Sequence, residues 1–125
     1  MNIPNDLKYT AEHEWIRLEG DEVVVGVTEF AQGELGDVVF VEIETEGESL
    51  SIGETFGTIE AVKTVSDLFM PLDGEILAVN PALEDAPELV NSSPFDQGWM
   101  IRIKLSDPAQ LDDLLSPEAY GELIG

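Results

Sequence analysis

The stretch that decides the fold is GTIEAVKTVSD, residues 57–67. Two segments rich in apolar and β-branched residues, 55–61 and 65–70, predict strands on either side of Val62-Lys63-Thr64. Together they predict a hairpin over about residues 55–70, with Lys63 at its tip. A hairpin tip projects a flexible amine away from the body of a protein, where another enzyme can acylate it. Most lysines at such tips are inert solvated residues, so this pattern alone does not decide between the two interpretations.

Short strands are also predicted on both sides of the hairpin. The segments with suitable β-branched, aromatic or alternating residues are 13–18, 23–25, 37–43, 75–79 and 99–105. Residues 44–53 predict a loop with one short strand, and residues 80–94 a long connection with one helical turn after Asp85. Thr28 is a predicted N-cap for a short helix that ends by Gly33 or Gly36.

The C-terminus predicts a helical segment over about residues 107–124. Asp107 is a predicted N-cap with Pro108 at the first helical position, and Gln110 is expected to close a capping box. Ser116-Pro117 predicts the start of a second short helix in the same way. The leucines expected to face the body of the protein are Leu111, Leu114 and Leu115.

An internal echo suggests how the strands are arranged. Gly36-Asp37-Val38-Val39 resembles Gly74-Glu75-Ile76-Leu77, and the lysine hairpin lies between the two copies. We therefore predict a mainly β protein, a flattened β-sandwich or barrel of two quasi-symmetric half-sheets with short terminal helices. The length of 125 residues predicts a single domain over residues 1–125.

The charge of the chain excludes several classes of partner. Twenty-seven Asp and Glu face five Lys and Arg, giving a formal charge of −22 at pH 7. Such a surface repels phosphate backbones and anionic membranes, which argues against binding nucleic acid or a membrane. The acids are spread along the chain, which favours a hydrated halophilic coat over a surface shaped for one basic partner. If the coat is an adaptation to high salt, the melting temperature rises with molar salt, and a fall would refute this hypothesis.

Catalytic and metal-binding clusters are not expected. The chain has no cysteine and one histidine, so disulfides, thiolate–metal sites and Cys–His pairs are not predicted, and His13 is interpreted as structural. The many carboxylates leave paired-acid chemistry neither excluded nor assignable to particular residues. Residues 1–8 lack the apolar core of a signal peptide, and no apolar run is long enough to cross a bilayer, so we expect a cytoplasmic protein.

The hairpin stretch resembles the lipoylation hairpin of glycine cleavage H proteins. Further blocks resemble that family in order along essentially the whole chain: Lys8-Tyr9, His13-Glu14-Trp15, Gly26-Val27-Thr28, Ala31-Gln32, Leu35-Gly36-Asp37, Asn91-Ser92-Ser93-Pro94, Gly98-Trp99, Leu114-Leu115 and Tyr120. Biotin carriers flank their lysine with methionines, where this chain has Val62 and Thr64. Lipoyl domains of 2-oxoacid dehydrogenases usually place Asp before the lysine and lack the terminal helices. The resemblance implies the barrel-sandwich hybrid fold of lipoyl and biotinyl carriers.

The resemblance also implies a function. Lys63 would be joined by an amide to lipoic acid and become the base of a swinging arm, in a carrier rather than an enzyme. The implied partners are the glycine decarboxylase (P protein), the aminomethyltransferase (T protein), the dihydrolipoyl dehydrogenase (L protein), and a lipoate ligase or lipoyl synthesis enzymes. The arm would accept an aminomethyl group from the P protein, deliver it to the T protein and be reoxidised by the L protein. A carrier that visits three enzymes is expected to be a monomer.

Site residues follow from the same resemblance. Glu14 and Asp67, with the less typical Glu12, are the candidates for a cleft that pairs the charged end of the loaded arm and excludes water. Glu60, three residues before Lys63, is the candidate for recognition by the lipoylating enzyme. No catalytic residue and no metal ligand is implied. The competing interpretation is that all four acids belong to the general acidic coat.

One residue departs from the family pattern, and two alternative functions stay open. Many members of the family have histidine where this chain has Glu34, which puts the details of the cleft in question. The same sequence is compatible with a lipoyl donor or carrier for 2-oxoacid dehydrogenase complexes, and activity with the P protein would separate the two. An unmodified acidic scaffold or cation-binding module is the third possibility, which lipoylation of Lys63 would exclude.

Overall fold

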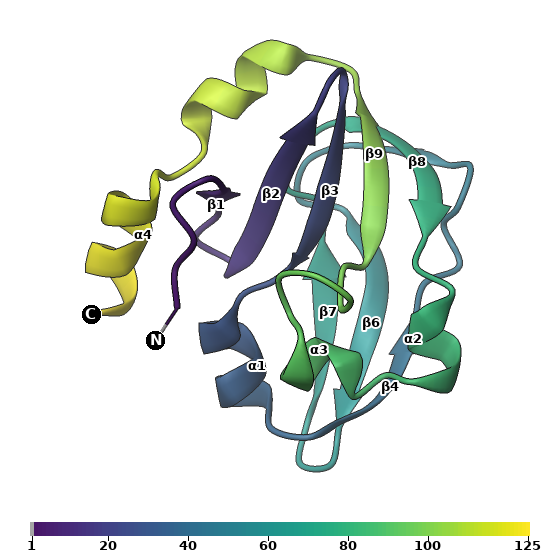
Figure 1. Cartoon of the computed structure of the whole chain (residues 1–125). Helices are drawn as coiled ribbons and strands as arrows, with labels where there is room; N and C mark the ends of the chain where they lie inside the picture. Colours follow the sequence, from purple (N-terminus) through teal and green to yellow (C-terminus); the bar gives the residue numbers. More distant parts are fainter. Residues whose placement is uncertain (1) are drawn as a thin grey trace.

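The structure is a computed structural model that describes residues 2–125, and these residues form two antiparallel sheets with short helices (Figure 1). The larger sheet has the order β1-β2-β3-β9-β8-β5, and the smaller one the order β4-β6-β7. The strands of the larger sheet are β1 (Lys8–Tyr9), β2 (Glu14–Glu19), β3 (Glu22–Val27), β9 (Ile101–Leu105), β8 (Gly74–Val79) and β5 (Ser49–Leu50). The strands of the smaller sheet are β4 (Val38–Glu42), β6 (Thr55–Ala61) and β7 (Val65–Phe69). The mainly β, two-sheet fold predicted from the sequence is confirmed.

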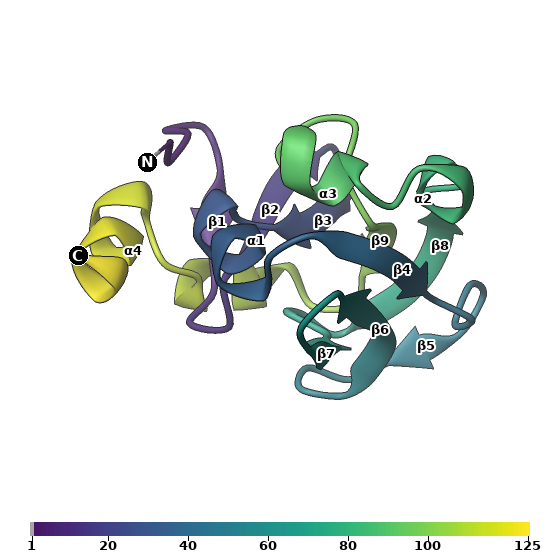
Figure 2. The same cartoon turned by 90° about the horizontal axis from the view of Figure 1, so that it is seen from below.

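The lysine hairpin consists of β6 and β7, which pair from Thr55 opposite Phe69 to Glu60 opposite Val65. Both strands lie where the sequence predicted them. The hairpin projects from the lower end of the molecule in Figure 1, and Figure 2 shows β4 beside it from below. The two echoing segments lie in different sheets, at the starts of β4 and β8. The sheets nevertheless differ in size, because β1 and β2 extend only the larger one.

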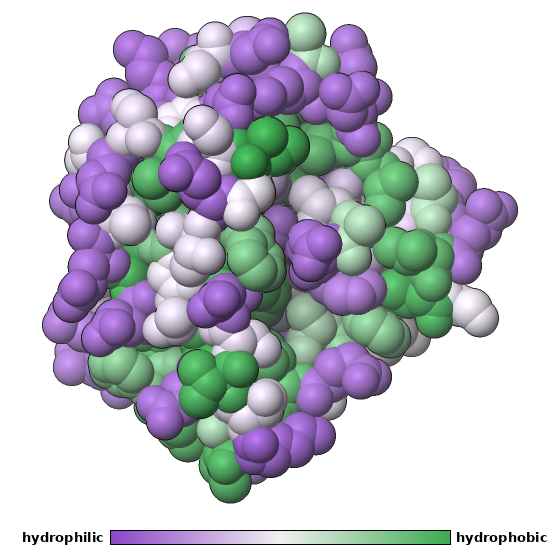
Figure 3. Space-filling view, turned by 180° about the vertical axis from the view of Figure 1, so that it is seen from behind, coloured by the Kyte–Doolittle hydropathy of each residue, from purple (hydrophilic) through white to green (hydrophobic). Residues whose placement is uncertain are grey.

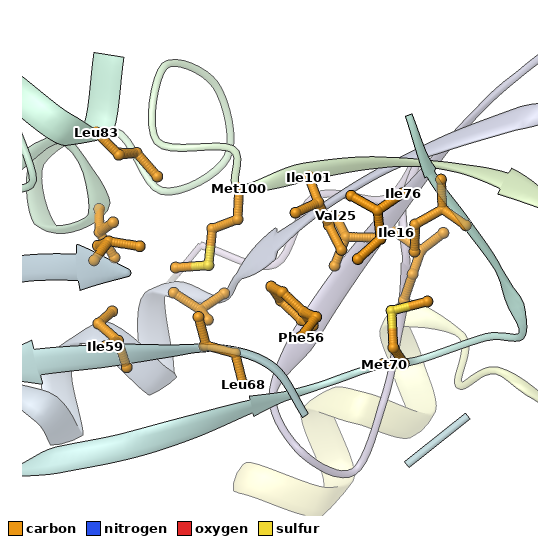
Figure 4. Packing of buried hydrophobic residues seen from close by; sticks show 14 of the residues in the cluster. Ile16, Val25, Phe56, Ile59, Leu68, Met70, Ile76, Leu83, Met100 and Ile101 are labelled. Atoms are coloured by element: carbon orange, nitrogen blue, oxygen red, sulfur yellow. The ribbon is translucent and has the colours of Figure 1, made fainter. Parts of the chain in front are cut away.

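Alternation of side chains between two faces builds the core between the sheets. Figure 4 shows Ile16, Val25, Ile76 and Ile101 of the larger sheet meeting residues of the hairpin and its flanks. Burial of such side chains contributes about 1.5–3 kcal/mol each, and this is the main stabilising term. The hairpin residues in this cluster are Phe56, Ile59, Leu68 and Met70. The hairpin therefore has an inner face that anchors it and a tip that extends beyond the core.

A second apolar cluster covers the outer face of the larger sheet, beneath the C-terminal helix. Trp15 and Tyr9 are fully buried there, and the Tyr9 ring stacks on Tyr120 with centroids 4.7 Å apart. Gly26 is required opposite Trp15, because an added Cβ would lie 2.7 Å from the indole ring. The two ends of the chain are thereby packed onto the same face of the sheet.

The helices mostly follow the predictions. Thr28 caps α1 (Glu29–Leu35) by accepting from the Ala31 N–H, and Gly36 ends the helix with φ of 84°. The connection over residues 80–94 contains two helical turns rather than the one predicted. The remaining helices are α2 (Ala82–Asp85), α3 (Leu89–Ser92), a 3₁₀ helix (Pro108–Asp113) and α4 (Pro117–Ile124). None of the helices formed by residues 2–125 has the length and apolar character needed to cross a membrane.

The predicted capping box at Asp107 is wrong. Asp107 does cap the helix by accepting from the Ala109 N–H, but the Gln110 side chain turns away from it. Gln110 instead accepts from the Asp73 N–H at 2.8 Å and donates to the Asp73 carboxylate at 3.0 Å. A pair of bonds to a distant turn outweighs one local bond, and it ties the C-terminal segment to the end of the hairpin connection.

Candidate functional site

Lys63 lies at the exposed tip of the β6–β7 hairpin. The Ala61 N–H donates to the Thr64 carbonyl at 2.8 Å and closes the turn, while the Val62 N–H donates to the Asp37 carbonyl at 3.0 Å. These bonds hold the backbone of the tip, but the flanking side chains point to solvent, with Val62 76% exposed. None of the ion pairs within residues 2–125 involves Lys63. The tip therefore presents a flexible amine on a fixed backbone.

The end of α1 forms a platform under the lysine side chain. A Cβ added to Gly36 would lie 3.1 Å from Lys63 Cε and 3.7 Å from Nζ, so the aliphatic part of Lys63 passes close over this glycine. The φ of 84° at Gly36 is also one that other residues rarely adopt. Both the backbone conformation and the space above it require glycine at this position.

Asn91, from α3, holds this platform in place. Its Nδ2 donates to the Gly36 carbonyl at 2.8 Å and to Gln32 Oε1 at 2.9 Å, and its Oδ1 accepts from the Val38 N–H at 2.9 Å. Asn91 thus joins the end of α1 to the start of β4, on either side of the Asp37 carbonyl that accepts from the hairpin tip. A residue distant in sequence from Lys63 therefore fixes the backbone segment that accepts a hydrogen bond from the hairpin tip.

A groove of about 460 Å³ begins next to the platform, between α1 and the hairpin. Three of the predicted acids line it, namely Glu12, Glu14 and Asp67, together with Glu34 of α1. The apolar part of the lining comes from Val27, Phe30, Ala31, Leu35, Ile59, Leu68 and Phe69. Leu35 precedes Gly36 directly, so the groove starts one residue from the surface under Lys63. An apolar floor with acidic edges suits an acyl chain that carries a cationic end.

Glu14 is the buried acid of the groove, with 4% of its surface exposed. Burial, more than any other cause, raises its pKa to about 8, and the negative charge of Glu12 adds to the shift. Hydrogen bonds from the Thr10 hydroxyl, at 3.1 Å, and from the Phe69 backbone act in the opposite direction. The Glu14 carboxyl therefore holds a proton at neutral pH in the unmodified chain. A cation brought close to it would favour the charged form.

The position of Glu14 is set by a tight turn over residues 10–14. The Thr10 hydroxyl accepts from the backbone N–H groups of Glu12 and Glu14, and His13 adopts a φ of 67°. The Tyr120 hydroxyl bonds His13 Nδ1 at 3.0 Å and Thr28 Oγ1 at 2.7 Å. His13 is thus a partnered structural residue held by the C-terminal helix, and its ring packs on Phe30 at the edge of the groove.

The structure separates the predicted site residues into two groups. Glu12, Glu14 and Asp67 meet in the groove, whereas Lys63 and Glu60 lie at the exposed end of the hairpin outside it. Within residues 2–125, no group of three or more acidic, His or Cys side chains could hold a metal ion. Phe30 and Phe69 also line the groove and were not predicted as site residues, because no local pattern distinguishes them from ordinary core residues.

The comparisons with known proteins are consistent along the chain. The family model described as glycine cleavage H-protein matches residues 7–125. The glycine cleavage system H protein of Bacteroides fragilis is 58% identical over 124 residues, covering 99% of this chain and 98% of the relative. That of Bacteroides thetaiotaomicron is 60% identical with the same coverage, and that of Staphylococcus carnosus 52% identical over the full chain and 99% of the relative.

The fold is also that of a solved structure. The crystal structure of a glycine cleavage system H protein from Mycobacterium marinum superposes with a TM-score of 0.85 and 40% sequence identity, covering 96% of this chain and 98% of that one. The family model, the relatives and the fold agree over nearly the whole length. The chain belongs to the glycine cleavage H-protein family, whose members are carrier subunits rather than enzymes.

Proposed function

We propose that this chain carries a lipoyl group in amide linkage to Lys63 and serves as the mobile carrier of a glycine cleavage system. The observation that supports this most directly is the hairpin tip, where an exposed amine stands on a backbone fixed by bonds to the Asp37 and Thr64 carbonyls. Acylation would form one amide bond between Nζ and the lipoyl carboxyl carbon, expel the activating group and remove the positive charge of the amine. A lipoate ligase or the enzymes of lipoyl synthesis would supply the activated acyl group.

The residues present fit such a group. The groove starts beside the lysine platform and offers an apolar floor of suitable size for an acyl chain. When bound, the lipoyl disulfide would supply the chemistry of accepting an aminomethyl group from the P protein, releasing it to the T protein and being reoxidised by the L protein. The protein would act as a monomer in the cytoplasm.

The groove residues have separate tasks in this proposal. The apolar lining, including Phe30 and Phe69, excludes water from the part of the arm that lies in the groove. Glu14 holds a proton on its carboxyl until a cationic group approaches, then releases the proton and pairs with the cation. Asp67 and Glu12, both exposed, contribute negative charge at the edge of the groove. Glu60 lies on the outer face of the hairpin, where a lipoylating enzyme could contact it.

The first experiment is an intact mass of the protein incubated with a lipoate ligase, ATP and lipoate, followed by peptide mapping. We expect one added lipoyl group on the peptide that contains Lys63, and none on the Lys63→Arg variant. Lys8 and Lys104 serve as internal controls, because both are exposed amines outside the hairpin. If a control carrier is lipoylated under the same conditions and this chain is not, the proposal is wrong.

A second function, as lipoyl donor or carrier for 2-oxoacid dehydrogenase complexes, shares the same modified lysine. The two are separated by glycine–bicarbonate exchange with the P protein, which the glycine cleavage carrier supports. Transfer of the lipoyl group to a dehydrogenase lipoyl domain, without activity in the exchange, would favour the donor function instead.

A further inference from the structure

Glu14 lines two cavities, not one. Besides the groove described above, it lines a second cavity of about 390 Å³, whose apolar residues include Ile52, Met70 and Pro71. Figure 3 shows the molecule from the side opposite to Figure 1, where the surface is hollowed and hydrophobic residues lie among hydrophilic ones. A carboxyl that borders two cavities can turn its oxygens towards either of them. A neighbouring group must therefore set the direction in which its charge points.

The side chain that holds the Glu14 carboxyl is Thr10, which also lines the second cavity. Its Oγ1 lies 3.1 Å from Glu14 Oε1 and accepts from the backbone N–H groups of Glu12 and Glu14, both at 3.2 Å. A hydroxyl has two lone pairs and one proton. Because the two N–H groups occupy both lone pairs, the hydroxyl proton is the one that lies between Oγ1 and Oε1.

This hydrogen bond gives the two oxygens of Glu14 different tasks. Oε1 accepts from Thr10, the Phe69 backbone is the only other donor to the carboxyl, and Oε2 has no side-chain partner among residues 2–125. Burial keeps a proton on Glu14 at neutral pH in the unmodified chain. Thr10 cannot accept this proton, because its lone pairs are in use, so the proton belongs on Oε2.

We propose that Thr10 is a positioning residue for charge pairing in the groove: its hydroxyl fixes Oε1, so that Oε2 is the oxygen that releases its proton to water and pairs with a cation. The inference rests on the proposed function, in which that cation is the end of the loaded arm. A hydrogen bond to a charged acceptor is stronger than one to a neutral acceptor. The Thr10 hydroxyl therefore favours the ionised carboxyl when the cation arrives.

The alternative is that Thr10 only holds the turn over residues 10–14, and the two roles predict opposite changes in the pKa of Glu14. In Thr10→Val, which keeps the shape of the side chain, loss of the hydroxyl donor should raise this pKa by about one pH unit. A turn that merely loosened would admit water and lower the pKa towards 4.5. Thr10→Ser keeps the hydroxyl, so it should restore the wild-type value.

The pKa is measured on the unmodified chain by ¹³C NMR of the glutamate carboxyls, with the Glu14 signal assigned by its absence from Glu14→Gln. Thr45→Val is the matched control, because the half-buried Thr45 lines neither cavity and donates its hydroxyl to the Phe56 carbonyl at 2.8 Å. It should leave the pKa of Glu14 at the wild-type value. Every variant keeps the other titratable groups that line the two cavities, which are Glu12, His13, Glu34 and Asp67.

A fall in the pKa of Glu14 in Thr10→Val, or no change, would overturn the role of Thr10. If Thr10→Val does not fold, a neutron structure of the wild-type chain in D₂O decides instead. It should place the Thr10 deuterium towards Oε1 and the Glu14 deuterium on Oε2, and any other placement contradicts the inference.

The loaded carrier separates this inference from the proposed function. After lipoylation and loading with glycine by the P protein, Thr10→Val should lose the aminomethyl group about fivefold faster than wild type, whereas Thr45→Val should match wild type. A wild-type chain that is never lipoylated refutes the proposed function and the pairing step with it. A wild-type chain that is lipoylated and loaded, with equal loss in Thr10→Val, refutes the role of Thr10 alone.

Discussion

The two ends of the β7 strand differ in what they expose. At one end, Val65 and the nearby Lys63 are exposed to solvent, and at the other, the Phe69 backbone donates a hydrogen bond to the buried carboxyl of Glu14. The tip thus makes an amine accessible to another protein, whereas the groove keeps a titratable group away from water. The contrast implies that substitutions at the tip change modification with little effect on stability, while substitutions at the Glu14 end change stability and its dependence on pH.

The largest expected effect is at the tip. Lys63→Arg should abolish lipoylation completely, because a guanidinium that stays protonated is not acylated. The free energy of unfolding should change by less than about 0.5 kcal/mol, since the side chain is exposed and has no ion-pair partner among residues 2–125. Intact mass and urea denaturation measure the two quantities. A loss of stability of several kcal/mol would mean that the tip supports the fold and that the contrast is false.

The second-largest expected effect is the loss of stability with rising pH that is caused by Glu14. Its pKa is about 8 in the folded chain against an ordinary value of 4.5, so between these values the folded state keeps a proton that the unfolded state has released. Stability that is present below pH 4.5 is therefore lost as the pH rises through 8. From pH 6 to pH 9 the loss attributable to this group is roughly 2–3 kcal/mol.

Glu14→Gln should remove that loss, because the amide does not titrate. Urea denaturation gives the difference in unfolding free energy between variant and wild type. This difference, variant minus wild type, should be roughly 2–3 kcal/mol larger at pH 9 than at pH 6. Subtracting variant from wild type cancels the titration of every group that the two proteins share. Parallel pH profiles would show that Glu14 is ionised in the folded chain at neutral pH, contrary to its burial.

Asn91 tests how the tip depends on the rest of the molecule. Asn91→Ala leaves the Gly36 carbonyl and the Val38 N–H without their partner, and it should lower the free energy of unfolding by about 2 kcal/mol. The amide proton of Val62, bonded to Asp37 on the same platform, should also exchange faster with solvent, as measured by hydrogen exchange.

Asn80→Ala is the matched control. The Asn80 side chain also makes three hydrogen bonds, to the Gln97 and Trp99 carbonyls and from the Ala82 N–H, but it contacts no part of the hairpin tip through them. Both variants should lose similar stability, whereas only Asn91→Ala should slow lipoylation of the folded protein. Equal lipoylation rates would mean that Asn91 has a structural role alone.

The hairpin could be predicted from the sequence because its causes are local. β-branched and apolar residues on either side of Lys63 favour strands, and their pairing needs only a tight turn. The short helix capped by Thr28 was predictable for the same reason. The side-chain bonds of Gln110 were predicted wrongly, because a distant turn at Asp73 competes with the local cap.

The environment of Glu14 could not be predicted from the sequence. Its surroundings include the Phe69 backbone, which the fold brings from far along the chain to donate a hydrogen bond, and a turn held by Tyr120. The position of Glu14 as a candidate for the groove came from resemblance to a family, whereas its protonated state follows only from the packing around it. The same holds for Asn91, whose three partners lie in α1 and β4.

The smallest effect tests the link between the C-terminal helix and the groove. Tyr120→Phe removes the hydroxyl that bonds His13 and Thr28, and it should cost about 1–2 kcal/mol of stability. Tyr9→Phe is the control, since Tyr9 is buried in the same stack and its hydroxyl donates to the Pro4 carbonyl at 2.7 Å, for a cost of about 1 kcal/mol.

The two tyrosine variants should differ in a second measurement, the change in unfolding free energy between pH 6 and pH 9. Without the Tyr120 hydroxyl, the His13 backbone is held less firmly in its positive-φ conformation, and water reaches the adjacent Glu14 more easily. The pKa of Glu14 should then move back towards 4.5, so the loss of stability from pH 6 to pH 9 becomes smaller in Tyr120→Phe than in Tyr9→Phe. Equal losses in the two variants would show that the turn over residues 10–14 keeps Glu14 buried without help from the C-terminal helix.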